Sequence, residues 1–172
     1  MFGSFMAFQT GARRRAPACL PGVDRLESRE LLAKVANVPA AFLFTPIPEG
    51  TILTEHIHSF LTINVNGQDV AIPKGIGLGP GGNLPIHTHD SSGILHVEST
   101  QAQPFRLRDF FTIWGQPFDK KHILGFTADK THKVAMSVNG RPSQAFGSVL
   151  LKDLEDIVIR YQTVGRGGQS RP

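Results

Sequence analysis

The chain of 172 residues is poor in several features that would point to particular classes of protein. It contains a single cysteine, Cys19, which excludes an internal disulfide and a metal site built from several thiolates. No apolar run approaches the roughly 20 residues that a membrane-spanning helix needs, so a membrane-spanning protein is not predicted. The glycines of GIGLGPGG are not followed by Lys-Ser or Lys-Thr, which argues against a phosphate-binding loop and favours a turning loop.

Positive charge is scarce in the body of the chain, although the formal net charge is +4 and the sequence pI is about 9.6. Residues 1–34 hold six Lys and Arg against three acids, and residues 160–172 hold three Arg and no acid. Residues 35–159 hold nine basic against eleven acidic residues. Because a nucleic-acid-binding protein needs basic side chains clustered on a folded face, no nucleic-acid partner is predicted.

The length and the 40% apolar content suit one domain with a real core. We expect residues 1–45 to be an N-terminal targeting or flexible segment, residues 46–163 to be a single metal-binding α+β domain, and residues 164–172 to be a disordered tail rich in Gly, Arg and Pro. The segment RRRAPACLPGVDRLESRELLA resembles the N-terminal segments of exported and surface proteins of planctomycete bacteria. That resemblance implies export, to the periplasm or outside the cell. An ordinary amphipathic helix is the alternative.

Two segments of the middle are predicted to form hairpins. LTINVNGQDVAI (61–72) and KVAMSVNGRPSQAF (133–146) each present an alternating apolar strand followed by Asn-Gly, the dipeptide that most favours a type I′ turn. Between them, PFRLRDFFTIWG has the apolar spacing of a helix that ends at Gly115 and packs on a sheet. The segment LKDLEDIVIRYQ is predicted to be the last strand, with Ile157, Ile159 and Tyr161 on one face.

This order of elements, with its leading I-x-V-N-G strand and closing L-x-D-x-E-D-I-V-I strand, resembles the β-grasp fold of ubiquitin-like and sulfur-carrier proteins. The resemblance covers about 80 residues if the segment 73–93 is an insertion, and it concerns the fold and not the activity. It implies an α+β protein: a β-grasp-like mixed sheet with one main packing helix and an inserted loop that carries histidines.

Alternation along the strands makes a prediction about the histidines. In TILTEHIHSFLTINVNG, His56 and His58 lie on the face opposite to Ile57, Leu61 and Ile63. In GILHVES, the same rule places His96 and Glu98 on the histidine face, and Leu95 and Val97 face the core. If these strands are neighbours, three histidines converge on one patch. We expect the inserted loop to cover that face and to bring His87 and His89 over it.

The middle of the chain also resembles a family of archaeal and bacterial proteins that has no assigned reaction. The match rests on an H-x-H strand leading to a V-N-G turn, the block HTHDSSGILHVES and the segment FRLRDFFTIWG, and it covers residues from about 56 to 115 and beyond. The resemblance implies that seven residues belong together: His56, His58, His87, His89, Asp90, His96 and Glu98. It implies no reaction.

Imidazoles two apart in a strand point the same way, and a third from a neighbouring segment can complete a set around an ion. With no thiolate or methionine adjacent, we expect a divalent transition metal ion, copper first, zinc second and iron third. Three histidines with an open position fit zinc or copper, whereas two histidines with Asp90 or Glu98 fit a ferrous site. Asp90 and Glu98 are better placed as acceptors for imidazole N–H groups. In an enzyme, one of them is the candidate general base.

Three functions follow from this pattern. The first is an exported metal-binding protein that stores, senses or delivers copper or zinc. The second is a mononuclear metalloenzyme, a hydrolase, hydratase or oxidase, that uses the same histidines. The third is a β-grasp protein-interaction module without a metal, in which the histidines are structural. A histidine-lined surface without a metal, or a patch that gains charge as the pH falls, is a further alternative to the metal site. The sequence identifies no substrate and no protein partner, and His122 and His132, single among lysines, are predicted to be surface residues.

Overall fold

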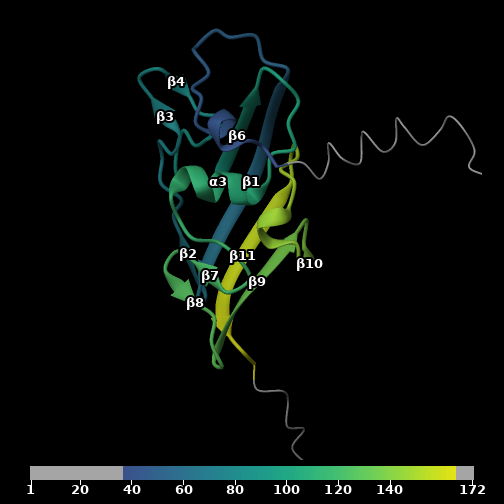
Figure 1. Cartoon of the computed structure of the whole chain (residues 1–172). Helices are drawn as coiled ribbons and strands as arrows, with labels where there is room; N and C mark the ends of the chain where they lie inside the picture. The colour runs from purple at the N-terminus through teal and green to yellow at the C-terminus, as the bar shows by residue number, and fades with distance from the viewer. Residues whose placement is uncertain (1–36, 166–172) are drawn as a thin grey trace, which may run out of the picture.

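A computed structural model describes residues 37–165 of the chain. The body of the protein is a seven-stranded mixed sheet in the order β10-β9-β11-β1-β6-β5, with β2 also paired to β1 (Figure 1). Its strands are β1 (Glu55–Val65), β2 (Gln68–Val70), β5 (Ile86–His87), β6 (Ile94–Ser99), β9 (His132–Val138), β10 (Arg141–Ser143) and β11 (Asp156–Thr163). Two small hairpins lie outside this sheet: β3 (Leu78–Gly79) with β4 (Gly82–Asn83), and β7 (His122–Ile123) with β8 (Phe126–Thr127). The helical elements are α2 (Ala40–Leu43), α3 (Leu107–Trp114) and the 3-10 turn η1 (Phe146–Ser148).

The long strand β1 organises the sheet. Its residues 60–65 run parallel to residues 156–161 of β11, while on its other edge residues 55–60 pair with β6 and residues 63–65 pair with β2, both antiparallel. A hairpin, one main helix, a second hairpin and a last strand parallel to the first form the predicted β-grasp-like α+β arrangement. The predicted fold class is therefore confirmed.

Both Asn-Gly pairs form the tight turns that the sequence predicts. Asn66 and Gly67 have φ values of 51° and 88°, and Asn139 and Gly140 have φ values of 50° and 75°. A type I′ turn requires positive φ at both central residues, which asparagine and glycine tolerate best. These turns connect β1 to β2 and β9 to β10 and set the register of each hairpin.

The helix α3 packs across one face of the sheet (Figure 1). At its start, the backbone N–H of Arg106 donates to the Asp109 carboxylate over 2.7 Å, and at its end Gly115 adopts φ 71°. Phe110 is fully buried and Phe111 is 2% exposed, and burial of each such side chain contributes about 1.5–3 kcal/mol. The largest fully buried hydrophobic side chains of the core are Phe105, Phe110, Ile63, Ile86, Leu95, Leu107, Ile123, Ile157, Ile159 and Val97.

The packed core begins earlier in the chain than residue 46. Val38 and Leu43 belong to the predicted segment 1–45, yet they are 6% and 4% exposed and join the hydrophobic core. The short helix α2 ends with Leu43. Burial of this apolar side chain in the core removes its surface from water and so stabilises the fold. The planctomycete-like segment and most of the predicted tail lie outside the described residues. Within residues 37–165, no helix is long and apolar enough to span a membrane.

The inserted segment 73–93 differs from its prediction. We expected it to lie over the histidine face, but Ile86 and His87 instead extend the sheet as the edge strand β5, opposite Val97 and His96 of β6. The backbone of this segment would otherwise leave N–H and C=O groups without partners, and pairing with the free edge of β6 satisfies them. His87 therefore meets the other histidines from the edge of the sheet, and His89 from the loop that follows β5. The expected approach of both residues to the other histidines is found.

Candidate metal centre

Three histidines form a row across three neighbouring strands. His58 of β1 lies directly opposite His96 of β6, and His96 lies directly opposite His87 of β5. The neighbours of His96 along β6, Leu95 and Val97, are fully buried on the core side. Because side chains alternate along a strand, this burial directs the imidazole of His96 to the other face. The predicted alternation in this strand is thus confirmed.

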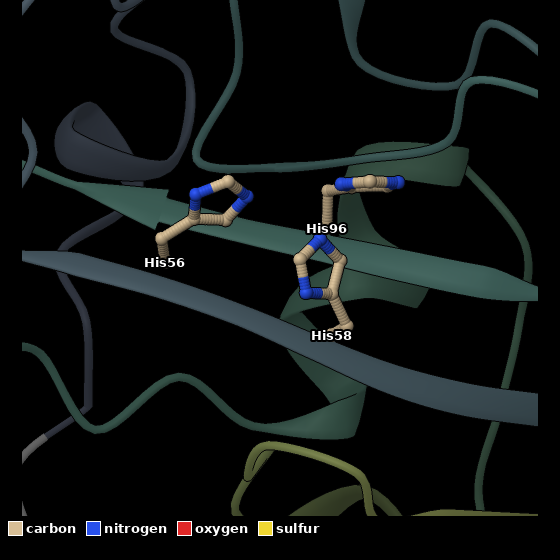
Figure 2. Close-up of side chains that lie close together, drawn as sticks. All are labelled: His56, His58 and His96. Atoms are coloured by element: carbon tan, nitrogen blue, oxygen red, sulfur yellow. The ribbon is translucent and has the colours of Figure 1, made fainter.

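The first group of candidate ligands is His56, His58 and His96. Their ring centroids lie 4.7 Å apart for His56 and His58, 4.6 Å for His58 and His96, and 6.4 Å for His56 and His96. One ring nitrogen of each lies within 4.8 Å of the others. Figure 2 shows the three rings on the same side of the two strands, gathered around a common point. His56 is exposed, and His58 and His96 are half-buried.

The second group is His87, His89 and His96, again with ring nitrogens within 4.8 Å of one another. The rings of His89 and His96 meet edge to face at 4.5 Å, and His87 lies parallel to His96 at 5.4 Å. The Nε2 atoms of His87 and His89 are 3.2 Å apart. At a metal–nitrogen bond of 2.0–2.1 Å, two ligands of a tetrahedral ion are about 3.3 Å apart, so this pair already has the separation of two ligands.

A backbone contact orients the ring of His87. Its Nδ1 lies 3.0 Å from the carbonyl oxygen of Leu84. A carbonyl accepts but cannot donate, so Nδ1 carries the proton and donates it, which leaves the lone pair of the neutral ring on Nε2. Metal-binding histidines in proteins are commonly fixed in this way. The fully buried His87 therefore presents Nε2 toward His89.

The environment keeps the central imidazoles neutral. Burial, and to a smaller extent the nearby rings of His89, His58, His87 and His56, together lower the pKa of His96 to about 4. Burial also lowers the pKa of His87, against a smaller opposing effect of its contact with Leu84 and of the Glu98 charge. Only the neutral ring has a lone pair for a metal, so near pH 7 these two residues are in the ligating form.

The two predicted carboxylates lie beside the histidines without joining either group. Glu98 Oε1 is 3.6 Å from His56 Nε2, at the edge of the first group. The Asp90 carboxylate accepts the backbone N–H of Ser92 over 2.9 Å, and the hydrogen bonds of Ser92 lower the pKa of Asp90. Asp90 thus holds the turn between β5 and β6. Both candidate groups found among residues 37–165 consist of histidines alone.

The glycine-rich loop packs against β5. Gly77 has φ 73°, and a Cβ atom placed there would lie 2.5 Å from the carbonyl oxygen of Ile86 and 3.1 Å from the Cβ of His87. The buried hydroxyl of Thr88 donates to the carbonyl of Pro73 over 2.8 Å. The predicted turning loop is confirmed, and the close approach at Gly77 is the reason for a glycine there.

A second contact that positions the site could not be predicted from the sequence. The Asp153 carboxylate accepts the backbone N–H of His58 over 3.0 Å, and the His58 carbonyl accepts the N–H of Leu154 over 2.8 Å. This contact joins residues 95 positions apart, and a lone aspartate in a turn carries no sequence signal for it. It fixes the backbone of β1 at the position of the first group.

The remaining histidines have other surroundings. His122 pairs with the Asp119 carboxylate at 2.9 Å, and the ring of His132 stacks on Tyr161 with centroids 5.0 Å apart. Neither belongs to a candidate metal group.

No family model, no curated protein and no solved structure matches the chain. The likeness to the archaeal and bacterial family and the planctomycete-like export segment therefore remain predictions.

Proposed function

We propose that this protein binds divalent transition metal ions through a site formed by His56, His58, His87, His89 and His96. The observation that carries the proposal is the presence of two groups of three imidazoles whose nitrogens lie within 4.8 Å. The lowered pKa of His96 means that its protonated form is disfavoured there, so the ring is neutral near pH 7 and keeps a lone pair for an ion. An ion would bind to the lone pairs that the fold brings together.

The ligand chemistry supports copper first and zinc second. Neutral imidazole suits Cu(II) and Zn(II), and copper has the higher intrinsic affinity for such ligands. Iron comes third, because its usual carboxylate ligand is missing from both groups. The exposure of His56 and His89 provides a route by which an ion enters and leaves. Together with export, inferred from the N-terminal resemblance, this favours storage or delivery of the metal outside the cytoplasm.

Metal analysis of the purified full chain tests the proposal. We expect stoichiometric Cu(II) or Zn(II) after equilibration and removal of free metal, and an affinity at least tenfold lower in His96→Ala, because that variant removes the ligand common to both groups. His122→Ala is the matched control, since His122 is a half-buried histidine outside the groups. At a free metal concentration 100 times the Kd, binding should raise the free energy of unfolding by about 2.7 kcal/mol. A parent chain that is folded and binds neither ion would refute the proposal and favour an interaction module.

A mononuclear metalloenzyme is the second candidate. Three imidazoles leave a coordination position for water, and Glu98, 3.6 Å from His56, is placed to accept a proton from it. X-ray absorption of the zinc form distinguishes the two functions: three nitrogens with an oxygen from water favour catalysis, and four or more protein ligands favour binding. Ester hydrolysis that is lost in Glu98→Gln while zinc stays bound would support the enzyme.

A further inference from the structure

The two candidate groups share one residue, and it is the central one. His96 belongs to both, while His56 and His58 belong to one and His87 and His89 to the other. His96 lies on β6, between β1 and β5. Its ring contacts all four other rings, at 6.4, 4.6, 5.4 and 4.5 Å. Among the residues that the structure describes, ring contacts are found within each outer pair and with His96, and not between the two pairs.

An imidazole has two nitrogens on opposite sides of its ring, and other histidine rings lie on both sides of His96. Figure 2 shows one nitrogen of His96 on the side of His56 and His58 and the other on the far side of the ring. The outer pairs therefore do not compete for the same position. One outer pair comes from β1, and the other from β5 and the loop after it, on the opposite side of β6. A single ion bound to all five histidines would have to draw both pairs together over β6.

We propose that His96 bridges two metal ions, one held with His56 and His58 and the other with His87 and His89. This inference rests on the proposed function and specifies its stoichiometry. The first ion takes the lone pair of the neutral ring. The second ion replaces the proton on the other nitrogen, which leaves as H⁺ to the solvent, and the ring becomes an imidazolate that donates one lone pair to each ion. With bonds of 2.0–2.1 Å, the ions lie about 6 Å apart.

Small side-chain rotations are sufficient to close each group. The most distant nitrogens within a group are up to 4.8 Å apart, and ligands of one tetrahedral ion are about 3.3 Å apart. The required closure of roughly 1.5 Å is within the reach of imidazole rotation about its two side-chain bonds. The backbone positions need not change, because His58, His96 and His87 are already opposite one another in the sheet.

Titration of the metal-free full chain with Cu(II), followed by electron paramagnetic resonance, tests the bridge. We expect two ions per chain. The copper signal should grow up to the first equivalent and then fall as the second enters, because two Cu(II) ions joined by an imidazolate couple antiferromagnetically. About one additional proton should be released with the second ion. The double variants His56→Gln with His58→Gln, and His87→Gln with His89→Gln, should each bind one ion with an undiminished signal, and His122→Gln should behave as the parent.

Several outcomes would overturn the bridge while leaving metal binding intact. A parent that binds one ion, with both double variants losing it, would indicate one centre shared by all five rings. Two ions with a full signal at two equivalents would indicate separate sites. The His56 and His58 variant decides the question even if the other fails to fold, because buried His87 is unchanged in it. A chain that binds no ion would instead refute the proposed function.

Discussion

The lowered pKa of His96 makes the stability of the metal-free protein depend on pH. In the unfolded chain this ring has its ordinary pKa of about 6.5, whereas in the fold, chiefly through burial, it lies at about 4. Between these values the unfolded chain binds a proton that the folded chain does not, so acidification favours unfolding. The contribution of His96 is complete above pH 6.5 and is lost as the pH falls from 6.5 to about 4.

The magnitude follows from the shift. At pH 5, a full shift from 6.5 to 4 corresponds to about 2 kcal/mol of lost stability. Because His96 is only half-buried, solvent screens part of this interaction, and we expect about 1 kcal/mol. His96→Gln has no titrating group at this position. The parent should therefore lose about 1 kcal/mol more than His96→Gln when the pH is lowered from 7.5 to 5.

Urea denaturation in the presence of a chelator measures this difference. The parent, His96→Gln and His122→Gln are compared at pH 7.5, 6.0, 5.0 and 4.5, and the free energy of unfolding is plotted against pH. His122→Gln controls for the loss of a half-buried histidine outside the groups, and its curve should run parallel to that of the parent. If the curves of the parent and of His96→Gln ran parallel over this range, the inference that the fold lowers the pKa of His96 would be refuted.

Two further predictions concern the supports of the site. Gly77→Ala should cost at least about 2 kcal/mol and weaken metal binding about tenfold, because its methyl group would lie 2.5 Å from the Ile86 carbonyl and displace β5. Gly75→Ala is the matched control, since Gly75 also has positive φ but nothing lies within 4 Å of its added Cβ; equal effects in the two variants would contradict the close approach. Phe110→Ala should cost about 3–5 kcal/mol by urea denaturation without changing the number of ions that the folded protein binds, whereas Phe44→Ala, at a half-exposed site, should cost less than 1 kcal/mol. A similar loss in both phenylalanine variants would contradict the packing of α3.

Much of the fold follows from short-range patterns in the sequence. The two Asn-Gly pairs predicted the turns because few other dipeptides tolerate two positive φ values in succession. Alternation in GILHVES predicted which face His96 occupies, because the side-chain direction in a strand depends on position alone. The helix and its end at Gly115 followed from apolar spacing and from the left-handed residue that ends it.

The parts that escaped prediction depend on contacts between distant segments. A strand of two residues such as β5 has no period to detect, so its place at the edge of the sheet could not be derived. The backbone carbonyl of Leu84 orients His87. Because every residue has a backbone carbonyl, the sequence carries no signal for this contact. Val38 and Leu43 precede the first regular strand, and their burial depends on a core surface that only the folded chain presents.

The alignment of β1, β6 and β5 links the chemistry of the site to the assembly of the protein. A shift of β6 by one residue would turn His96 into the core and expose Leu95 and Val97, because a slip reverses every side chain of a strand. An ion bound across these strands would favour the native pairing over the shifted one, because the shifted chain offers fewer ligands to the ion. Metal present during folding would therefore select the native pairing of segments about 40 residues apart, and would act as a removable cross-link in a chain that has a single cysteine.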